Sequence, residues 1–219
     1  GEVGMIFDFL ETKRHHVRSY KKQAPLQSTI DQALWKAWKT TPSKNNAMPY
    51  KVFVWRKQKD LDILYKIAAE NNTSGDRSKK LYNPYFDHIK TAPFLLTIHQ
   101  RVATPNKYYK RSIIKDNLWY EWSDKKYFKD ALIGTTIEVG MFVANLTCYL
   151  LEEGIDVSYN GCFKHSAPEW QKAGLKEVRT KPLIMMSMGY VDKYRKEVMA
   201  TNYQQEDIKP ESKDVIEWI

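Results

Sequence analysis

The longest predicted helix of the chain, over residues 130–153, most constrains what the chain can fold into. Its apolar side chains recur at helical spacing. One face consists of Ile133, Ile137, Met141, Ala144, Cys148 and Leu151, and it is widened by Phe142, Leu146, Tyr149 and Leu150. A helix that is apolar over so much of its surface is expected to be buried, in a core or at an interface. Other elements, or another chain, must therefore cover it.

Several shorter segments have the composition of β-strands. Residues 50–55, 93–99 and 182–190 combine β-branched, aromatic and other apolar side chains, which predicts strands. Residues 156–161 form a shorter extended piece with a turn, and residues 215–219 read as a terminal strand. Helical segments lie between the strands, and no linker rich in glycine or serine divides the chain. We therefore expect one α+β domain over the whole chain, with a central, mainly antiparallel sheet flanked by helices.

Local signals mark where helices begin and end. Residues 28–31 (Ser-Thr-Ile-Asp) form a capping-box pattern, and the helix that follows should stop before Pro42. Residues 166–169 (Ser-Ala-Pro-Glu) predict a second capped start, and residues 60–71 have one apolar helical face. Gly154 is the residue expected just beyond the end of the long helix.

Composition narrows the environment and the partners. The 219 residues suffice for a hydrophobic core, and a net charge of +9 attracts anions such as nucleotides, nucleic acid or acidic surfaces. Two cysteines, Cys148 and Cys162, do not make a disulfide framework and fit a reducing compartment. No signal-peptide pattern opens the sequence, and no run approaches the roughly 18 apolar residues of a membrane span. We expect a cytoplasmic protein without a membrane partner.

A cluster of positive charge occupies residues 13–18 (Lys-Arg-His-His-Val-Arg), after a short predicted helix over residues 5–13. Five potentially cationic side chains within six positions repel one another, so an anion is expected to offset the cost. Phosphate is the natural candidate, because guanidinium groups bind it through two parallel hydrogen bonds. Taken alone, the cluster also fits a solvated basic helix end.

Several kinds of site are not indicated. The sequence has no Gly-x-Gly-x-x-Gly or phosphate-loop motif, which argues against a Rossmann site or a P-loop. It has no Cys-x-x-Cys pair, and the adjacent His15 and His16 would point in different directions on a helix, so no metal site is expected. His88, His99 and His165 are scattered and read as surface or core histidines.

Several motifs in order resemble a known family. Residues 13–20 read K-R-H-H-V-R-S-Y, and residues 41–50, after an amphipathic helix, read T-P-S-K-N-N-A-M-P-Y. This order is similar to the start of the nitroreductase family of FMN-dependent flavoproteins. The long helix followed by residues 159–163 (Y-N-G-C-F) resembles the family's helix and flavin loop, and residues 183–190 end in a matching Gly-Tyr. The resemblance covers nearly the whole chain and is weakest at residues 100–130.

The resemblance implies roles for the basic cluster. Arg14 and His16 would approach the FMN phosphate, with His15 beside them. Arg18 would reach the pyrimidine edge of the flavin, where a cation stabilises the negative charge of the reduced ring. Lys209 corresponds to a second phosphate-binding cation near the C-terminus.

Two loops would complete the site. Ser43, Asn45 and Asn46 would border the ring and the ribityl chain. The backbone N–H groups of Asn160 and Gly161 would face N5 of the flavin.

The chain also departs from the family pattern. His16 replaces a usual serine, so a hydroxyl contact becomes an imidazole contact that depends on pH. Met48 and Tyr50 replace a glutamine and a tryptophan of the loop, which changes the details of that wall. Asn83 corresponds to a flavin-contacting asparagine of the family only with a shift of about one residue.

The family's activity implies an FMN-dependent oxidoreductase. It would transfer hydride from NAD(P)H through flavin N5 to an electron-poor acceptor such as a nitroaromatic or a quinone. The family also implies a homodimer with FMN at the subunit interface, and a C-terminal segment, residues 202–219, that extends onto the partner subunit and adds a strand there.

Two alternatives remain at this point. A flavoprotein of the same fold could perform different chemistry, such as dehalogenation or flavin breakdown. The stretch at residues 104–128 interleaves aromatic and basic side chains, which also fits a nucleic-acid-binding module. The family instead places a variable, substrate-facing excursion or flap there.

Overall fold

The computed structural model of the chain describes residue 10, residue 17 and residues 19–71, 87–101, 132–163, 166–192 and 210–217. The predicted helix at residues 5–13, apart from Leu10, and the stretch at residues 104–128 lie outside this part of the chain.

Four antiparallel strands form the central sheet. They are β1 (Tyr50–Trp55), β2 (Phe94–Gln100), β3 (Asp156–Asn160) and β4 (Pro182–Gly189). The order across the sheet is β1-β2-β4-β3, and every neighbouring pair is antiparallel. The three strands predicted from composition are confirmed to within one residue at each end, and the short extended piece at residues 156–161 supplies the fourth.

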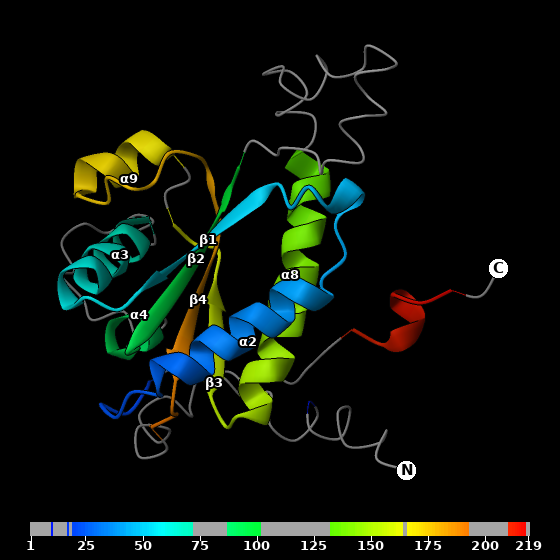
Figure 1. The fold of residues 1–219 in the computed structure, drawn as a ribbon, viewed down its shortest axis with the longest axis horizontal. Coiled ribbons are helices and arrows are strands. Elements are labelled where there is room, and N and C mark those ends of the chain that lie inside the picture. The colour runs from blue at the N-terminus through cyan, green and yellow to red at the C-terminus, as the bar shows by residue number, and fades with distance from the viewer. Residues whose placement is uncertain are drawn as a thin grey trace.

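Helices cover both faces of this sheet (Figure 1). One face carries α2 (Gln27–Thr40) and the long α8 (Leu132–Glu152), and the other carries α3 (Gln58–Asn71), α4 (Asp87–Thr91) and α9 (Ala167–Ala173). Two short 3-10 helices, η1 (Lys44–Asn46) and η4 (Ser212–Asp214), complete the described elements. The α+β architecture with an antiparallel sheet flanked by helices is therefore confirmed.

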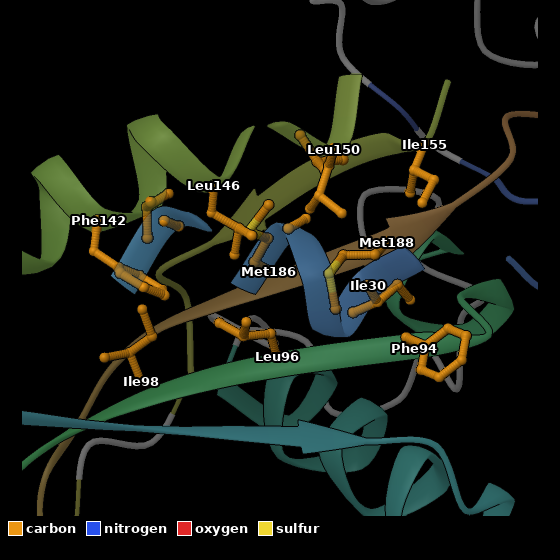
Figure 2. Packing of buried hydrophobic residues seen from close by; sticks show 14 of the residues in the cluster. Ile30, Phe94, Leu96, Ile98, Phe142, Leu146, Leu150, Ile155, Met186 and Met188 are labelled. Atoms are coloured by element: carbon orange, nitrogen blue, oxygen red, sulfur yellow. The ribbon is translucent and has the colours of Figure 1, made fainter. Parts of the chain in front are cut away.

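The strip of α8 that faces the sheet is the set of residues that widens the predicted apolar face, and the strip named first in that prediction lies elsewhere on the helix. Phe142, Leu146 and Leu150 pack against strand residues such as Met186 and Leu96 (Figure 2). Burying a side chain of this size contributes about 1.5–3 kcal/mol. Ile133 and Ile137 are instead 74% and 60% exposed, because the sheet covers only one side of the helix.

Further observations on α8 correct the sequence prediction. Ala144 is exposed as well, so the first predicted strip is uncovered over much of its length within one chain. Residues Ile133–Glu152 are also long and apolar enough to cross a membrane, by length and composition alone, which the sequence reading did not anticipate. Core helices of non-membrane proteins satisfy the same test, and α8 packs against the sheet.

The two predicted capping boxes have different outcomes. Ser166 caps α9 as expected: its Oγ accepts a hydrogen bond from the Glu169 N–H and donates one to the Glu169 carboxylate. At the start of α2 the prediction is wrong. The helix begins at Gln27, because the carbonyl of Leu26 already accepts from Ile30 N–H, so Ser28 lies inside the first turn.

The C-terminal strand prediction is not met in the described residues. Residues 212–214 form η4, and Val215 has the backbone conformation φ −119° and ψ −28°, which is not extended. A strand needs an edge to pair with, and in the single chain residues 215–217 pair with none of the named strands. The side chains of Val215 and Ile216 are both exposed, and residues 218–219 lie outside the described part.

His99 is a core histidine, as its sequence context indicated. Its ring stacks edge-on against Phe53 and Trp170. Nε2 lies 2.8 Å from Thr97 Oγ1, which accepts from Trp55 Nε1, and Nδ1 faces the carbonyl of Thr180. Burial lowers the pKa of His99 from 6.5 to about 4, against a smaller opposing effect of that carbonyl.

This lowered pKa predicts an acid-sensitive core. The unfolded chain takes up a proton at this residue below pH 6.5, whereas the folded chain does so only near pH 4. Stability is therefore lost as the pH falls between these values, by about 2–3 kcal/mol at pH 4.5. We expect urea unfolding of His99→Gln to depend less steeply on pH than wild type between pH 7 and 4.5. Parallel pH profiles for the two proteins would contradict this account.

Candidate functional site

The register of the sheet gathers several loops at one end. Tyr50 at the start of β1 pairs with Gln100 at the end of β2, and His99 pairs with Pro182 at the start of β4. Asn160, the last residue of β3, pairs with Met185 on the same side. We call this the Asn160 end of the sheet; the opposite end, where β3 begins at Asp156, is the Asp156 end. The loop before β1, the residue after β2 and the turn after β3 all lie at the Asn160 end.

Hydrogen bonds fix the loop before β1 from within and from α8. Ser43 Oγ accepts from Met48 N–H at 2.8 Å, which closes the loop on itself. Glu138 Oε1 accepts from Lys44 N–H at 2.9 Å, which ties the start of η1 to the long helix. Glu138 is the single charged residue within the apolar span 132–151, a signal that could have marked it as a loop anchor.

Arg101, directly after β2, holds the other side of the same loop. Its Nη2 donates to the carbonyls of Ala47 and Met48 at 2.7 Å each, and its Nε donates to Met48 at 3.1 Å. These bonds hold a strained backbone, since Asn46 and Met48 have φ values of 50° and 44°. Asparagine tolerates this region, but for methionine it is rare. Met48, which replaces a glutamine of the family, is thus fixed through its main chain. No motif in the sequence points to Arg101.

Two buried polar atoms lie beside this loop. Neither the hydroxyl of Tyr50 nor Oε2 of Glu138 has a hydrogen-bond partner among the described residues. Burial, and secondarily the charge of Glu138, raise the pKa of Tyr50 to about 12, while Arg101 opposes the shift. The phenol is therefore protonated at neutral pH. Its ring packs 5.5 Å from that of Phe142, at the inner side of a groove of about 1000 Å³.

The walls of this groove are largely apolar. Trp35 and Trp38 of α2 line one side, and Val52 and Val54 of the edge strand β1 line the other. Both tryptophans are more than half exposed. From α8, Phe142 lines the groove as well.

The turn after β3 forms the second part of the Asn160 end. The Asn160 side chain is buried, and its Oδ1 accepts from Cys162 N–H at 2.5 Å, which fixes the turn. Phe163 is fully buried edge-on against Trp170 and anchors the far side. Gly161 between them is exposed, and a Cβ placed there would meet nothing within 4 Å. A flat ligand can therefore approach this backbone closely.

The structure gives the positions of some of the predicted site residues. Ser43, Asn46, Asn160 and Gly161 lie at the Asn160 end, and the backbone of Asn45 belongs to η1, although its side chain is not described. The remaining predicted residues lie outside the described part of the chain: Arg14, His15, His16, Arg18, Asn83 and Lys209.

The chain just after the basic cluster is firmly attached. Tyr20 forms a β-bridge with Val191, its N–H donates to Thr91 Oγ1, and its hydroxyl shares a 2.8 Å hydrogen bond with Ser187 Oγ. Burial raises the pKa of this phenol strongly. Val17, only 1% exposed, packs in the core on the α3 face. Val17 within the basic cluster and Tyr20 just after it are therefore fixed to the α3 side of the sheet, and the bridge of Tyr20 lies at the Asp156 end.

Comparison with known proteins agrees with the fold. The sequence model of the nitroreductase family matches residues 12–190 of the chain. No curated protein matches the sequence. In the described part of the chain, no group of three His, Cys, Asp or Glu side chains could hold a metal ion.

Solved structures share the fold at low sequence identity. A nitroreductase from Exiguobacterium sibiricum in complex with FMN is 14% identical, with a TM-score of 0.69 over 98% of this chain and 97% of that one. A BluB-like flavoprotein from Clostridium difficile is 18% identical, with a TM-score of 0.64 over 98% of each chain. Iodotyrosine deiodinase bound to FMN and 3-iodo-L-tyrosine is 18% identical, with a TM-score of 0.59 over 86% of this chain and 91% of that one.

The hydrogen bonds of Arg101 predict that it keeps the loop at residues 43–48 closed. Arg101→Met keeps an unbranched side chain but removes three bonds to two carbonyls. We expect the free energy of unfolding to fall by about 1–3 kcal/mol, and amide hydrogen exchange in this loop to quicken roughly tenfold or more. Lys51→Met, an exposed cation on β1, is the matched control and should change neither. Unaltered loop exchange in Arg101→Met would show that Arg101 does not hold the loop.

Proposed function

The chain belongs to the nitroreductase family, and from this premise we propose that it is an FMN-dependent oxidoreductase. In this proposal it transfers hydride from NAD(P)H, through N5 of the flavin, to an electron-poor acceptor such as a nitroaromatic or a quinone. The observation that carries the proposal is that the Ser43–Asn46 loop and the Asn160–Gly161 turn lie at the same end of the sheet, next to its two edge strands β1 and β3.

The residues at the Asn160 end are suited to a flavin. The open space at Gly161 leaves room for a flat ring against the backbone. The neighbouring turn is fixed by Asn160 Oδ1, so its N–H groups are preorganised. The Ser43–Asn46 loop is held by Glu138 and Arg101, which lowers the entropic cost of binding a ligand against it.

Each part of the site receives a role in the proposal. Arg14 and His16, with His15 beside them, bind the FMN phosphate, and Lys209 adds a second cation there. Arg18 faces the pyrimidine edge, where its charge stabilises the anionic character of the reduced ring.

The loops orient the ring in this proposal. Ser43, Asn45 and Asn46 border the ring and the ribityl chain, and the backbone N–H groups of Asn160 and Gly161 face N5. Asn83 is a further candidate contact to the flavin.

FMN, when bound, supplies the hydride-accepting and hydride-donating chemistry at its N5 atom. The chain's own residues supply orientation and charge, and no side chain has to act as a nucleophile. Because donor and acceptor occupy the same ring face in turn, the site needs a flat slot that admits both. The excursion at residues 104–128 is proposed to face that slot as a flap.

We also propose that two copies of the chain form a homodimer in the cytoplasm. Ile133 and Ile137 of α8 and Trp35 and Trp38 of α2 are more than half exposed, and such apolar surface is typical of an interface. Among the described strands β1 is an edge strand, so a further strand can pair with it beside the groove. Residues 202–219 of the partner, with their exposed apolar end, are proposed to extend onto this surface.

One finding favours a second candidate activity within the same fold. Among the structures with this fold is a deiodinase bound to FMN and an iodinated tyrosine. Reductive dehalogenation is therefore the alternative chemistry for the proposed site. Turnover of the reduced protein with a panel of nitroaromatics, quinones and halogenated phenols separates the two, because each activity predicts a different preferred acceptor.

The proposal predicts a yellow, dimeric protein. The purified full chain should carry or take up about one FMN per chain, and anaerobic NADPH or NADH should bleach its visible absorption. Light scattering of the same fraction should give twice the chain mass. A colourless preparation that fails to bind added FMN would refute the flavoprotein proposal. An FMN-bound monomer would refute only the homodimer.

A further inference from the structure

A second cleft, of about 600 Å³, lies at the Asp156 end of the sheet. Arg56 follows β1, Pro93 precedes β2 and Asp192 follows β4, and all three line it. The strands are five to eight residues long, so this cleft lies roughly 17–25 Å from the Asn160 end. It is therefore separate from the Ser43–Asn46 loop and the Asn160–Gly161 turn, although Ser19, which lines it, directly follows Arg18 of the basic cluster.

Positive charge converges on this cleft from three segments of the chain. Lys22, Arg56 and Lys90 line it, against one acidic residue, Asp192. No carboxylate among the described residues lies within 4.0 Å of any of these three cations. Arg56 uses one of its N–H groups for Gln27 Oε1, and the Lys90 ammonium lies 5.8 Å from the Tyr65 ring centre. Their charge is thus available to an anion.

Uncharged groups at the cleft favour an anion as well. The first turn of α3 lines it through Gln58 and Leu61, and the hydrogen bonds of this helix begin with Asp60 and Leu61 N–H to Lys57 O. The N–H groups of Gln58 and Lys59 precede that ladder and carry the positive end of the helix dipole. Asp60 also belongs to this turn but does not line the cleft.

Ser19 is the second, independent sign of a ligand. It lines the cleft, is only 4% exposed, and its Oγ has no hydrogen-bond partner among the described residues. A buried hydroxyl without a partner is unfavourable, and rotation about its Cα–Cβ bond changes which group it can reach. A phosphate oxygen in the cleft supplies the missing acceptor.

We propose that this cleft binds a phosphate group, either free or as a small phosphomonoester. Phosphate combines a double negative charge with several acceptor oxygens, which matches three cations, helix N–H groups and a hydroxyl. The volume leaves space beside a phosphate for a small substituent. This site does not depend on the proposed oxidoreductase activity.

Calorimetric titration of the full chain at low ionic strength, loaded with FMN and then freed of unbound FMN, tests the proposal. The bound FMN fills the proposed flavin site and no free FMN phosphate competes for the cleft, so added phosphate reports on the second site. We expect saturable binding of inorganic phosphate, of glycerol 3-phosphate, or of both, at one site per chain. Tighter binding of the ester identifies an esterified ligand, and tighter binding of phosphate identifies the free ion. If neither ligand saturates below roughly 20 mM, the proposal is wrong, since a site with several charge-assisted hydrogen bonds binds more tightly than that.

Variants distinguish a specific phosphate site from the non-specific attraction of anions to a basic protein. Arg56→Met and Lys90→Met should each weaken phosphate binding about tenfold or more, and Ser19→Ala by a smaller factor. Lys90 is exposed, so its replacement should leave the far-ultraviolet circular dichroism unchanged. Lys172→Met, an exposed cation on α9, is the matched control and should change the affinity less than twofold. Equal losses in Lys172→Met and Lys90→Met would overturn the proposal.

Discussion

The antiparallel register of the central sheet is the constraint on which the rest of the structure depends. Because β1, β2, β4 and β3 alternate in direction, the loop before β1, Arg101 after β2 and the turn after β3 all lie at one end of the sheet, with the loop and the turn on opposite edges. A slip of one residue in any pair would also move the side chains of the slipped strand from one face of the sheet to the other. The same pairing that buries Leu96 and Met186 against α8 therefore sets the spacing of the candidate flavin loops.

The long helix links this core to the loops and to the outside. Its buried strip packs on the sheet, and Glu138 on its first turns holds the loop before β1. Its other strip, with Ile133 and Ile137, is uncovered in the single chain. One helix thus supports the core, positions a loop of the candidate site and offers apolar surface for a second copy. Removing such apolar surface from water is favourable, and this is the physical basis for the proposed homodimer.

Much of the fold was predictable from the sequence because its signals are local. Strand composition at residues 50–55 and 182–190, and the Ser166 cap, act within a few residues and were confirmed. The strip of α8 that is buried was not predictable, because both strips are apolar and only the position of the sheet decides between them. The start of α2 was misplaced for a similar reason, since a backbone carbonyl at Leu26 took the role expected of Ser28.

For the candidate site, the order of the motifs was the sequence signal that grouped distant residues, and this grouping stays a prediction. The motifs placed Ser43, Asn46, Asn160 and Gly161 in one site, and the sheet register brings them to one end. Arg101 and Glu138 act through main-chain groups of the loop, and such contacts depend on tertiary structure. A lone charge inside an apolar helix was the one sequence signal that pointed to Glu138.

Amide hydrogen exchange of the full chain, with and without saturating FMN, tests the central claim most directly. The account predicts slower exchange on FMN binding at residues 43–47 and 160–162, at the Asn160 end. It predicts no change at residues 56–58, at the Asp156 end. Saturation with FMN that leaves both loops unprotected, or that protects the Asp156 end instead, would contradict the proposed site.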